Sequence, residues 1–336
     1  MKAIICQEPF RLDVVARPEP RAGEGELLLR IKRVGLCGTD YHIFGGRHPY
    51  LAYPRVIGHE LAGEVVCAPT DSTFRTGQLV AINPYLACGD CVACRKGKPN
   101  ACVNVRVLGV HVDGGMCELL AVAESAALDA TDLSLDQAAM VEFLSVGAHA
   151  VARANLNTGA RVLVVGAGPI GVAVALFAGL DGALVTLVDR RRRRLDYARD
   201  RLGFDDVIEA GAELPNVLAN RTQGEMFDAV FDATGVIAAM TESLSYVSHG
   251  GVLVLVGVAQ GNLAFPGPEF HKRETTLLSS RNALAQDFER VIAAIKANQI
   301  PTDALRTHSF PAEEAVTRIP ELIAGADGVL KAIAHF

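Results

Sequence analysis

The stretch Arg161–Leu180, RVLVVGAGPIGVAVALFAGL, decides the fold of this chain. Its first five residues have the apolar, β-branched character of a buried strand, and an apolar helical segment ends it. Between them, Gly166, Gly168 and Gly171 follow the spacing G-x-G-x-x-G. Glycines at that spacing permit a tight turn, a close approach of the backbone to a pyrophosphate, and close packing of a helix on a strand. The stretch therefore predicts a strand, a dinucleotide-binding turn and a helix.

The start of this helix and the end of the next strand complete the predicted cofactor site. Pro169 and Ile170 open the helix, where backbone amides and the positive end of the helix dipole favour phosphate groups. Asp189 closes the next apolar run, 23 positions after Gly166. An acid there accepts hydrogen bonds from a ribose diol and repels a 2′-phosphate, so NAD is favoured over NADP. Arg190 begins a run of five arginines, which either attracts a 2′-phosphate or forms a solvated helix start.

Strands and helices alternate around that stretch and predict an α/β domain, which we place at residues 145–281. The expected strands lie at 161–165, 184–188, 228–232, 252–256 and 276–279, and the expected helices at 169–180, 190–202 and 236–247. This alternation is typical of a doubly wound parallel sheet with helices on both faces, the Rossmann arrangement.

The N-terminal part has a different character, because it consists of short β-type runs punctuated by glycine and proline. Such runs occur at residues 27–34, 60–66, 78–82 and 116–122. They predict a β-rich, barrel-like domain with long loops over residues 1–144. Residues 282–336 contain a predicted helix at 285–297 and then short pieces, and we expect this tail to return to the first domain.

Four cysteines lie close together in ACGDCVACRKGKPNAC: Cys88, Cys91, Cys94 and Cys102. Four thiolates at this spacing can surround one metal ion, and four-sulfur sites favour zinc or iron–sulfur centres. Two disulfides are disfavoured, because cysteines so close in the chain pair poorly and no secretory signal is visible. We predict zinc. A four-sulfur zinc site is usually closed, so its expected role is structural.

The composition excludes several other classes of protein. The formal net charge is −6, so nucleic acid is not an expected partner. The start MKAIICQEPFR lacks the apolar segment of a signal peptide, and glycines and a proline interrupt the uncharged run 162–180, so we expect no membrane helix. Eight cysteines without a secretory context suggest a reducing compartment, and the expected location is cytoplasmic.

A second set of potential metal ligands is scattered along the chain. Cys37 lies in GLCGTDYH, His59 and Glu60 in VIGHE, and Glu142 in MVEFLSVG. A catalytic zinc typically has three protein ligands and an open position. Spacing alone does not define such a site here. Read singly, each residue is more often structural: a buried thiol, a packed histidine or a helix-start acid.

As a whole, the chain resembles the zinc-containing medium-chain alcohol dehydrogenases, and among them the sorbitol, threonine and sugar-acid (L-galactonate type) dehydrogenases. The resemblance runs essentially end to end and is carried by GLCGTDYH, GHELAGEV, the cysteine quartet, EFLSVGAH and VGAGPIG in the family's order. It implies a GroES-like catalytic domain formed by both ends of the chain, a Rossmann domain between them, and two zinc ions per subunit.

The resemblance also implies the ligands of a catalytic zinc. Cys37 and His59 would bind the metal together with one acid. Glu142 occupies the third-ligand position used by much of the family, whereas in the sorbitol-type branch the acid after the histidine, here Glu60, can bind instead. The two acids could also exchange during turnover, so both belong to the expected site.

Five further residues receive roles by the same resemblance. Thr39 would take the proton of the alcohol, and His42 would pass it to solvent. Asp40 would orient the zinc-bound histidine from behind the metal. Phe143 stands where the polyol enzymes usually have proline, and would change the floor of the substrate site. Arg281 would contact the substrate, where a guanidinium suits a carboxylate better than vicinal hydroxyls; a surface ion pair or a cofactor contact is the alternative.

Together these residues imply a zinc-dependent oxidoreductase that transfers a hydride from a secondary alcohol of a polyol or sugar acid to NAD+. A zinc ion with an open position would bind the substrate hydroxyl and lower its pKa. A simple alcohol or amino-alcohol dehydrogenase on the same scaffold is one alternative, and a catalytically inactive NAD-binding protein is another. The expected partners are a small-molecule alcohol and further copies of the chain, in a homodimer or homotetramer.

Overall fold

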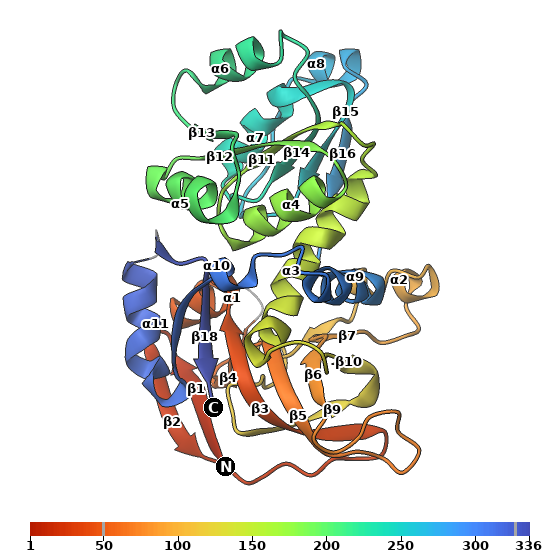
Figure 1. The fold of residues 1–336 in the computed structure, drawn as a ribbon, viewed down its shortest axis with the longest axis vertical. Helices are drawn as coiled ribbons and strands as arrows, with labels where there is room; N and C mark the ends of the chain where they lie inside the picture. The colour runs from red at the N-terminus through yellow and green to blue at the C-terminus, as the bar shows by residue number, and fades with distance from the viewer. Residues whose placement is uncertain (49–50, 326–327) are drawn as a thin grey trace. The chain divides into compact units, whose positions relative to one another are not determined.

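The computed structural model describes residues 1–48, 51–325 and 328–336, which form two compact units (Figure 1). Unit 1 consists of Met1–Phe143 and Leu284–Phe336, and unit 2 of Leu144–Ala283. The chain passes from unit 1 to unit 2 within helix α3, Leu135–Ala154. Unit 1 is therefore assembled from both ends of the chain.

Unit 2 is a parallel sheet of six strands in the order β13-β12-β11-β14-β15-β16. Its strands are β11 (Arg161–Val165), β12 (Leu184–Asp189), β13 (Val207–Glu209), β14 (Phe227–Asp232), β15 (Val247–Leu255) and β16 (Thr276–Ser279). Its helices are α4 (Pro169–Leu180), α5 (Arg192–Leu202), α6 (Leu214–Arg221), α7 (Ile237–Ser243) and α8 (Gly267–Lys272). The strand order reverses between β11 and β14, the place where such sheets bind ligands. The predicted doubly wound α/β fold is confirmed.

Two predicted helix boundaries in unit 2 are wrong. The helix expected at 236–247 ends at Ser243, because Val247 already pairs with Phe227 as the first residue of β15. The helix expected from residue 190 begins at Arg192, because the Arg191 amide turns back to hydrogen-bond Asp189. In both places a contact outside the helix decides where it ends or begins.

Unit 1 contains a larger sheet in the order β10-β6-β5-β3-β18-β17, with β9 also paired to β3, and two small sheets, β2-β1-β4 and β7-β8. Its strands are β1 (Lys2–Glu8), β2 (Arg11–Ala16), β3 (Glu26–Leu36), β4 (Arg55–Val56), β5 (Glu60–Cys67), β6 (Leu79–Ile82), β7 (Tyr85–Leu86), β8 (Arg106–Val107), β9 (Leu119–Ala123), β10 (Ala127–Asp129), β17 (Arg306–Pro311) and β18 (Lys331–His335). Its other helices are α1 (Gly38–Phe44), α2 (Val92–Arg95), α9 (Ala285–Lys296), α10 (Thr302–Leu305) and α11 (Ala315–Ala324).

Strand β3 organises the core of unit 1. Leu27, Leu29 and Ile31 alternate with more exposed residues and are fully buried, as expected for a strand with one face on the core. Each such side chain contributes about 1.5–3 kcal/mol by leaving water. Strand β18 pairs antiparallel with the end of β3, through Ala332 and Leu36. Strand β18 thereby lies between β3 and β17 in the sheet.

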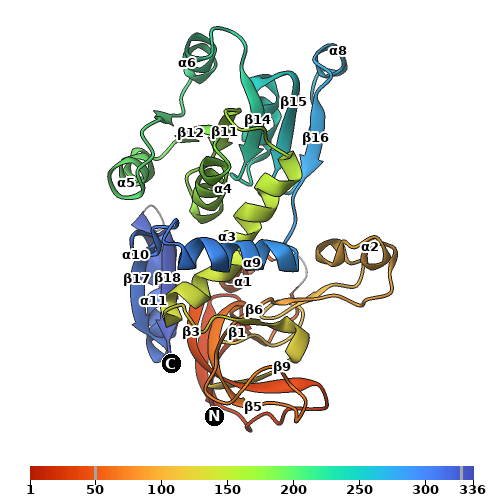
Figure 2. The ribbon, with the colours of Figure 1, turned by 45° about the vertical axis from the view of Figure 1, so that its right-hand side comes forward.

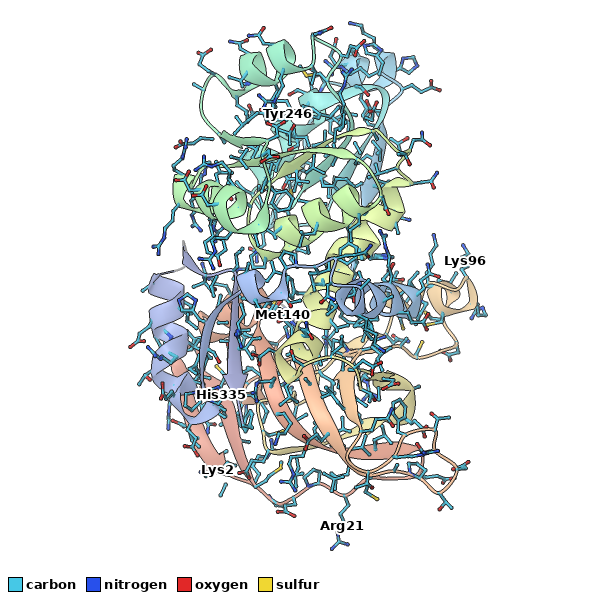
Figure 3. All side chains as sticks on the ribbon, viewed as in Figure 1. Lys2, Arg21, Lys96, Met140, Tyr246 and His335 are labelled. Carbon is cyan, nitrogen blue, oxygen red and sulfur yellow. The ribbon has the colours of Figure 1, made fainter. Side chains whose placement is uncertain are left out.

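The segment around α2 stands out from the rest of unit 1 (Figure 2). Lys96, directly after α2, lies at its outer edge (Figure 3). We call residues 88–102 the α2 lobe. Within it Asn100 and Cys102 are buried and no residue of α2 is, so apolar packing contributes little to holding this lobe. Among the described residues, no helix is both long and apolar enough to cross a membrane.

Candidate metal centres and cofactor site

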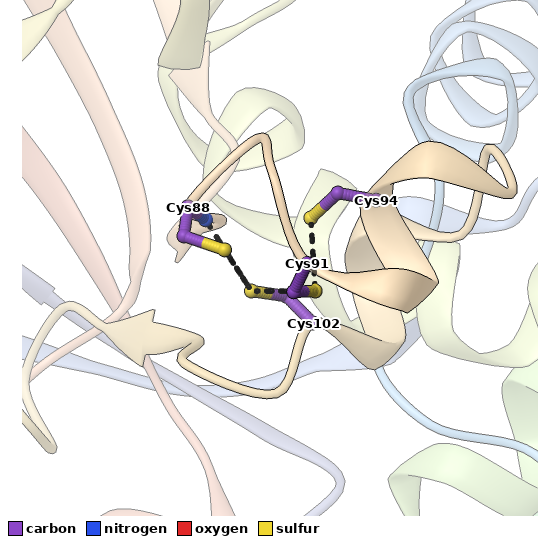
Figure 4. Close-up of side chains that lie close together, drawn as sticks. All are labelled: Cys88, Cys91, Cys94 and Cys102. Atoms are coloured by element: carbon purple, nitrogen blue, oxygen red, sulfur yellow. Dashed lines mark hydrogen bonds between the residues drawn. The ribbon is translucent and has the colours of Figure 1, made fainter.

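The four cysteine sulfurs of the quartet gather in the α2 lobe (Figure 4). Cys88 Sγ lies 3.4 Å from Cys102 Sγ. Cys91 Sγ lies 3.8 Å from Cys102 Sγ and 3.5 Å from Cys94 Sγ. Thiolates arranged as a tetrahedron at about 2.3 Å from a zinc ion would be about 3.8 Å apart. The sulfur spacing therefore fits one zinc ion.

Backbone amides prepare this quartet for a metal. The amide of Cys88 donates to Cys102 Sγ at 3.3 Å, and that of Val103 to Cys91 Sγ at 3.5 Å. Hydrogen bonds from the amides of Cys94 and Val103 lower the pKa of the Cys91 thiol to about 6. The thiolate is the form that binds metals. All eight cysteines are free. A metal site requires free thiols, whereas a disulfide framework would pair them.

A second group consists of Cys37, His59 and Glu60, whose ligand atoms lie within 4.8 Å of one another. Cys37 precedes α1, and the other two lead into β5. His59 is 4% exposed and Glu60 is fully buried. Within the described part of the chain, the Nδ1 atom of His59 has no hydrogen-bond partner. A thiolate, an imidazole and a carboxylate are the donors that catalytic zinc takes, so these residues fit the metal.

Asp40 holds the two halves of this group together. Its Oδ2 accepts the Cys37 amide at 2.9 Å, and its Oδ1 accepts the Gly58 amide at 3.2 Å. Oδ1 also lies 3.9 Å from His59 Nδ1. Burial opposes a charge on His59, but the negative charges of Asp40 and Cys37 outweigh it and raise the pKa of the ring. Gly58 adopts φ 90°, where a side chain would press against Val34.

Glu60 has a buried cation as its partner. Lys331 Nζ, on β18, lies 2.6 Å from each carboxylate oxygen of Glu60 and 3.1 Å from the Leu36 carbonyl oxygen. The same Nζ is 4.2 Å from the centre of the Phe143 ring. Gly35 leaves room for the acid, because a Cβ there would collide with the Glu60 carboxylate. Sequence reasoning missed Lys331, which is 271 positions from Glu60.

Glu142 lies on α3, is 5% exposed, and accepts a hydrogen bond from the Tyr85 hydroxyl. Burial raises the pKa of Glu142, although the positive charge of a protonated His59 opposes the rise. Its carboxylate is outside the 4.8 Å group, while the charges of His59 and Glu60 both act on it. Tyr85 also went unnoticed in the sequence, because a tyrosine in a short strand carries no distinctive pattern.

The two residues predicted to move the proton lie on α1. Thr39 Oγ1 is 3.8 Å from Cys37 Sγ. Burial lowers the pKa of His42, so its ring is neutral at pH 7. Burial also lowers the pKa of His48, and the nearby rings of His111 and His42 add to the effect. His48, which sequence reasoning did not select, therefore belongs to the surroundings of His42.

The glycine-rich turn in unit 2 has the conformation that the sequence predicts. Gly166 adopts φ 105° and its amide donates to the Val188 carbonyl at 2.7 Å. Gly168 precedes α4 as its N-cap, and Pro169 and Ile170 form the first turn. A side chain at Gly171 would collide with the Gly166 carbonyl oxygen. The close approach of helix to turn therefore requires glycine, and the α4 amides face the end of β11.

Asp189 connects this turn to the start of α5. Its Oδ2 accepts the Ala167 amide and its Oδ1 accepts the Arg191 amide, each at 2.8 Å. A carboxylate has about four acceptor positions, so both oxygens keep capacity for the hydroxyls of a ribose. Arg194 Nη1 lies 3.8 Å from Asp189 Oδ2, so this arginine of the run faces the carboxylate. Arg190, the first arginine of the run, is exposed.

The two residues predicted to contact the substrate belong to different units. Phe143 is 1% exposed and covers Lys331 in unit 1. Arg281 follows β16 in unit 2 and is exposed. Their roles toward a substrate stay predictions.

Comparison with known proteins identifies the family of this chain. Residues 23–132 match the alcohol dehydrogenase GroES-like domain, and residues 169–297 match the zinc-binding dehydrogenase domain. L-galactonate-5-dehydrogenase of Escherichia coli is 41% identical, over 93% of this chain and 92% of the relative. D-altritol 5-dehydrogenase of Agrobacterium fabrum is 30% identical, over 94% of each.

Solved structures agree with this result. A short chain alcohol dehydrogenase from Escherichia coli, crystallised with NADH, superposes with a TM-score of 0.93 at 29% identity and covers 100% of this chain and 99% of its own. The predicted cofactors, zinc and NAD(H), are confirmed at the level of the family. The chain belongs to the zinc-containing medium-chain alcohol dehydrogenases, in the branch that includes the polyol and sugar-acid enzymes.

Proposed function

We propose that this enzyme oxidises a secondary alcohol of a sugar acid or polyol and transfers the hydride to NAD+. The observation that carries the proposal is the group of Cys37, His59 and Glu60, in which His59 and Glu60 are buried and Cys37 is half-buried, with Glu142 nearby. Relatives named for a sugar acid and for a sugar alcohol, at 41% and 30% identity, support this class of substrate.

In this proposal Cys37, His59 and one of the acids Glu60 and Glu142 hold the catalytic zinc, and the cysteine quartet holds a structural zinc. A bound zinc ion lowers the pKa of a coordinated hydroxyl, which favours loss of its proton near neutral pH. The thiolate and one carboxylate together balance the two positive charges of the ion. Asp40 keeps the ring of His59 and the amide of Cys37 in place.

The proton leaves through α1. The Thr39 hydroxyl accepts the proton of the substrate while it donates its own proton onward, and His42 accepts the relayed proton and delivers it to solvent. The lowered pKa of His42 supports the second role, because a ring that is neutral at pH 7 has a nitrogen free to accept a proton.

The cofactor lies on the glycine-rich turn of unit 2. Gly166, Gly168 and Gly171 allow the backbone to approach the pyrophosphate, and the first turn of α4, at Pro169 and Ile170, supplies its dipole. Asp189 accepts hydrogen bonds from the hydroxyls of the adenine ribose. Arg190, the next residue in the chain, lies beside Asp189. NAD supplies the hydride acceptor when bound.

On the substrate side, Phe143 shapes the floor of the zinc site and Arg281 binds a carboxylate of the substrate. Arg281→Met separates these substrate classes. It should raise KM for an aldonate by about ten-fold or more, the loss expected for a charged contact, and change KM for the matching polyol little.

One experiment tests the whole proposal. The purified protein is incubated with NAD+ and a panel of aldonates, polyols, threonine and simple alcohols, and NADH is followed by absorbance. We expect the highest kcat/KM on an aldonate or polyol, and two zinc ions per subunit by elemental analysis. Absence of NADH with every aldonate and polyol contradicts the proposal. If threonine or a simple alcohol is the preferred substrate, the proposed substrate class of sugar acids and polyols is wrong.

We further propose that the protein is a cytoplasmic homodimer or homotetramer. Free cysteines throughout the chain support a reducing compartment. Light scattering of the purified protein measures its mass directly, and a monomer would contradict the assembly.

A further inference from the structure

Tyr85 lies between the α2 lobe and the buried acid Glu142. It is the first residue of β7, which ends at Leu86, just before Cys88 of the quartet. Its hydroxyl donates a hydrogen bond to the carboxylate of Glu142 on α3. The backbone of Tyr85 therefore belongs to the base of the lobe, while its side chain holds an acid next to the group of Cys37, His59 and Glu60.

The chain enters and leaves the α2 lobe through a ribbon formed by β7 and β8. Tyr85 pairs with Val107 in this ribbon. At the end of the ribbon nearer the quartet, the Cys88 amide donates to Cys102 Sγ at 3.3 Å. Each strand has only two residues, and so short a ribbon is marginal by itself. A metal bound by Cys88 and Cys102 closes the loop between them and so pins the register of the ribbon.

The ring of Tyr85 is also held from α9. The fully buried Phe288 meets it edge to face, with ring centroids 6.2 Å apart and planes at 65°. This is a favourable arrangement for two aromatic rings, and it fixes the direction of the phenol. Burial and the charge of Glu142 raise the pKa of Tyr85. The charges of Cys37 and Glu60 add to the rise, which agrees with a hydroxyl that lies beside the group.

The position of the Glu142 carboxylate affects the group whichever acid binds the metal. Glu142 is 5% exposed, and burial raises its pKa. The charges of His59 and Lys331 oppose the rise, and that of Glu60 adds to it. Charges away from water act strongly on one another, so a carboxylate that shifts when it loses its donor changes the field at Cys37 and His59.

We propose that Tyr85 is a positioning residue that couples the cysteine quartet to the chemistry at Cys37 and His59, because it fixes the Glu142 carboxylate from the base of the α2 lobe. Metal in the quartet pins the ribbon, the ribbon places the phenol, and the phenol places the acid. The inference rests on the two proposed zinc sites. It gives the lobe an effect on turnover in addition to its effect on stability, and one hydrogen bond carries that effect.

A double-mutant cycle in the full-length protein tests the coupling, with kcat measured on the preferred alcohol. Tyr85→Phe removes the hydroxyl but keeps the ring against Phe288. It should lower kcat by about ten-fold or more, the loss of one hydrogen bond to a charged group, and leave KM for NAD+ unchanged. Cys94→Ser should lower kcat by about five-fold in the wild-type background and by less than about two-fold in the Tyr85→Phe background, where the connection is already cut. Equal losses in both backgrounds overturn the coupling.

A second measurement does not depend on turnover. The visible absorption of cobalt bound in the group of Cys37, with zinc in the quartet, reports the geometry around that metal. Tyr85→Phe and Cys94→Ser should each shift the cobalt bands, and the double variant should match Tyr85→Phe alone. Unchanged bands in Tyr85→Phe overturn the positioning role, and this result decides the question even if Cys94→Ser does not fold.

Tyr246→Phe is the matched control. It also removes a hydrogen bond from a buried tyrosine to a carboxylate, the 2.7 Å contact with Glu242, but in unit 2. It should leave kcat and the cobalt bands unchanged, and a shift as large as that of Tyr85→Phe would contradict a specific role of Tyr85. A wild-type protein that binds metal only in the quartet overturns the proposed function and this inference with it. Two metals and full turnover with an additive cycle overturn the coupling alone, so the two failures are distinguishable.

Discussion

The cysteine quartet and the buried group around Cys37 place similar donors in opposite settings. The quartet lies within Cys88–Cys102, in a lobe whose helix has no buried residue. The second group takes Cys37 from the residue before α1 and takes His59 and Glu60 from the start of β5, with the last two buried in unit 1. If the quartet binds zinc as proposed, the metal holds the chain in the lobe. In the core, apolar packing holds the chain, and the chain can in turn hold a metal.

This difference implies that the same kind of substitution has different consequences in the two places. A ligand lost from the quartet removes what fixes the lobe, and so costs stability. A ligand lost from the buried group leaves the core packed and costs chemistry.

The largest effect is expected for Cys37→Ser. It should lower kcat/KM by about 1,000-fold or more, because polarisation of the substrate by the metal is worth several kcal/mol. The melting temperature should change by less than about 2 °C, since the core around the site is unaltered. A large fall in melting temperature measured by calorimetry would show that the buried metal, too, is structural.

Cys94→Ser should have the opposite profile. We expect loss of one zinc per subunit, a fall in melting temperature of about 5 °C, and proteolysis confined to residues 88–102. Activity per folded molecule should fall by less than about ten-fold. Cys67→Ser is the matched control, because this cysteine is exposed and outside both groups. Equal loss of activity in the Cys94 and Cys37 variants would contradict the division into a structural and a catalytic metal site.

A smaller effect is expected behind the metal, at Asp40. Asp40→Asn keeps the size of the side chain but removes the charge that lies 3.9 Å from His59. The affinity of the buried site for zinc should fall about 10- to 100-fold, while that of the quartet is unchanged. Release of each metal to a chromogenic chelator measures both, with the exposed Asp71→Asn as control. Faster release from the quartet would contradict the separation of the two sites.

The smallest effect is expected at Asp189, which lies in unit 2 and outside both metal groups. Asp189→Ala should weaken NAD binding by about ten-fold, the loss of one or two hydrogen bonds to ribose, and narrow the preference for NAD over NADP. Fluorescence titration with NADH and NADPH measures both. Zinc content should stay as in the wild type. If the preference for NAD over NADP is unchanged in this variant, the proposed contact of Asp189 with the ribose is wrong.

What the sequence predicts follows the same division between local and distant contacts. The strand, turn and helix at residues 161–180 are local, and β11 and α4 begin and end at the predicted residues. The helix expected to reach Val247 fails, because pairing with Phe227 takes that residue into a strand. Local propensity does not include such tertiary contacts.

The candidate site divides in the same way. Cysteine spacing is a local signal and indicates the quartet without any knowledge of the fold. Cys37 and His59 were expected only through the family resemblance, because no spacing connects them. Tyr85 and Lys331 had no signal at all. Their partners Glu142 and Glu60 are 57 and 271 positions away, and only the fold of unit 1 shows which acid each one meets.

The position of Lys331 on the C-terminal strand has a consequence for biosynthesis. Glu60, which is buried beside β3, is translated early. Its counter-ion Lys331 is translated 271 residues later. Until β18 has been made and inserted, unit 1 contains a carboxylate that is costly to bury. Unit 2, a continuous segment, can complete its sheet while the nascent chain is still growing. Unit 1 has to wait for β18, so we expect the group of Cys37, His59 and Glu60 to be completed among the last events of folding.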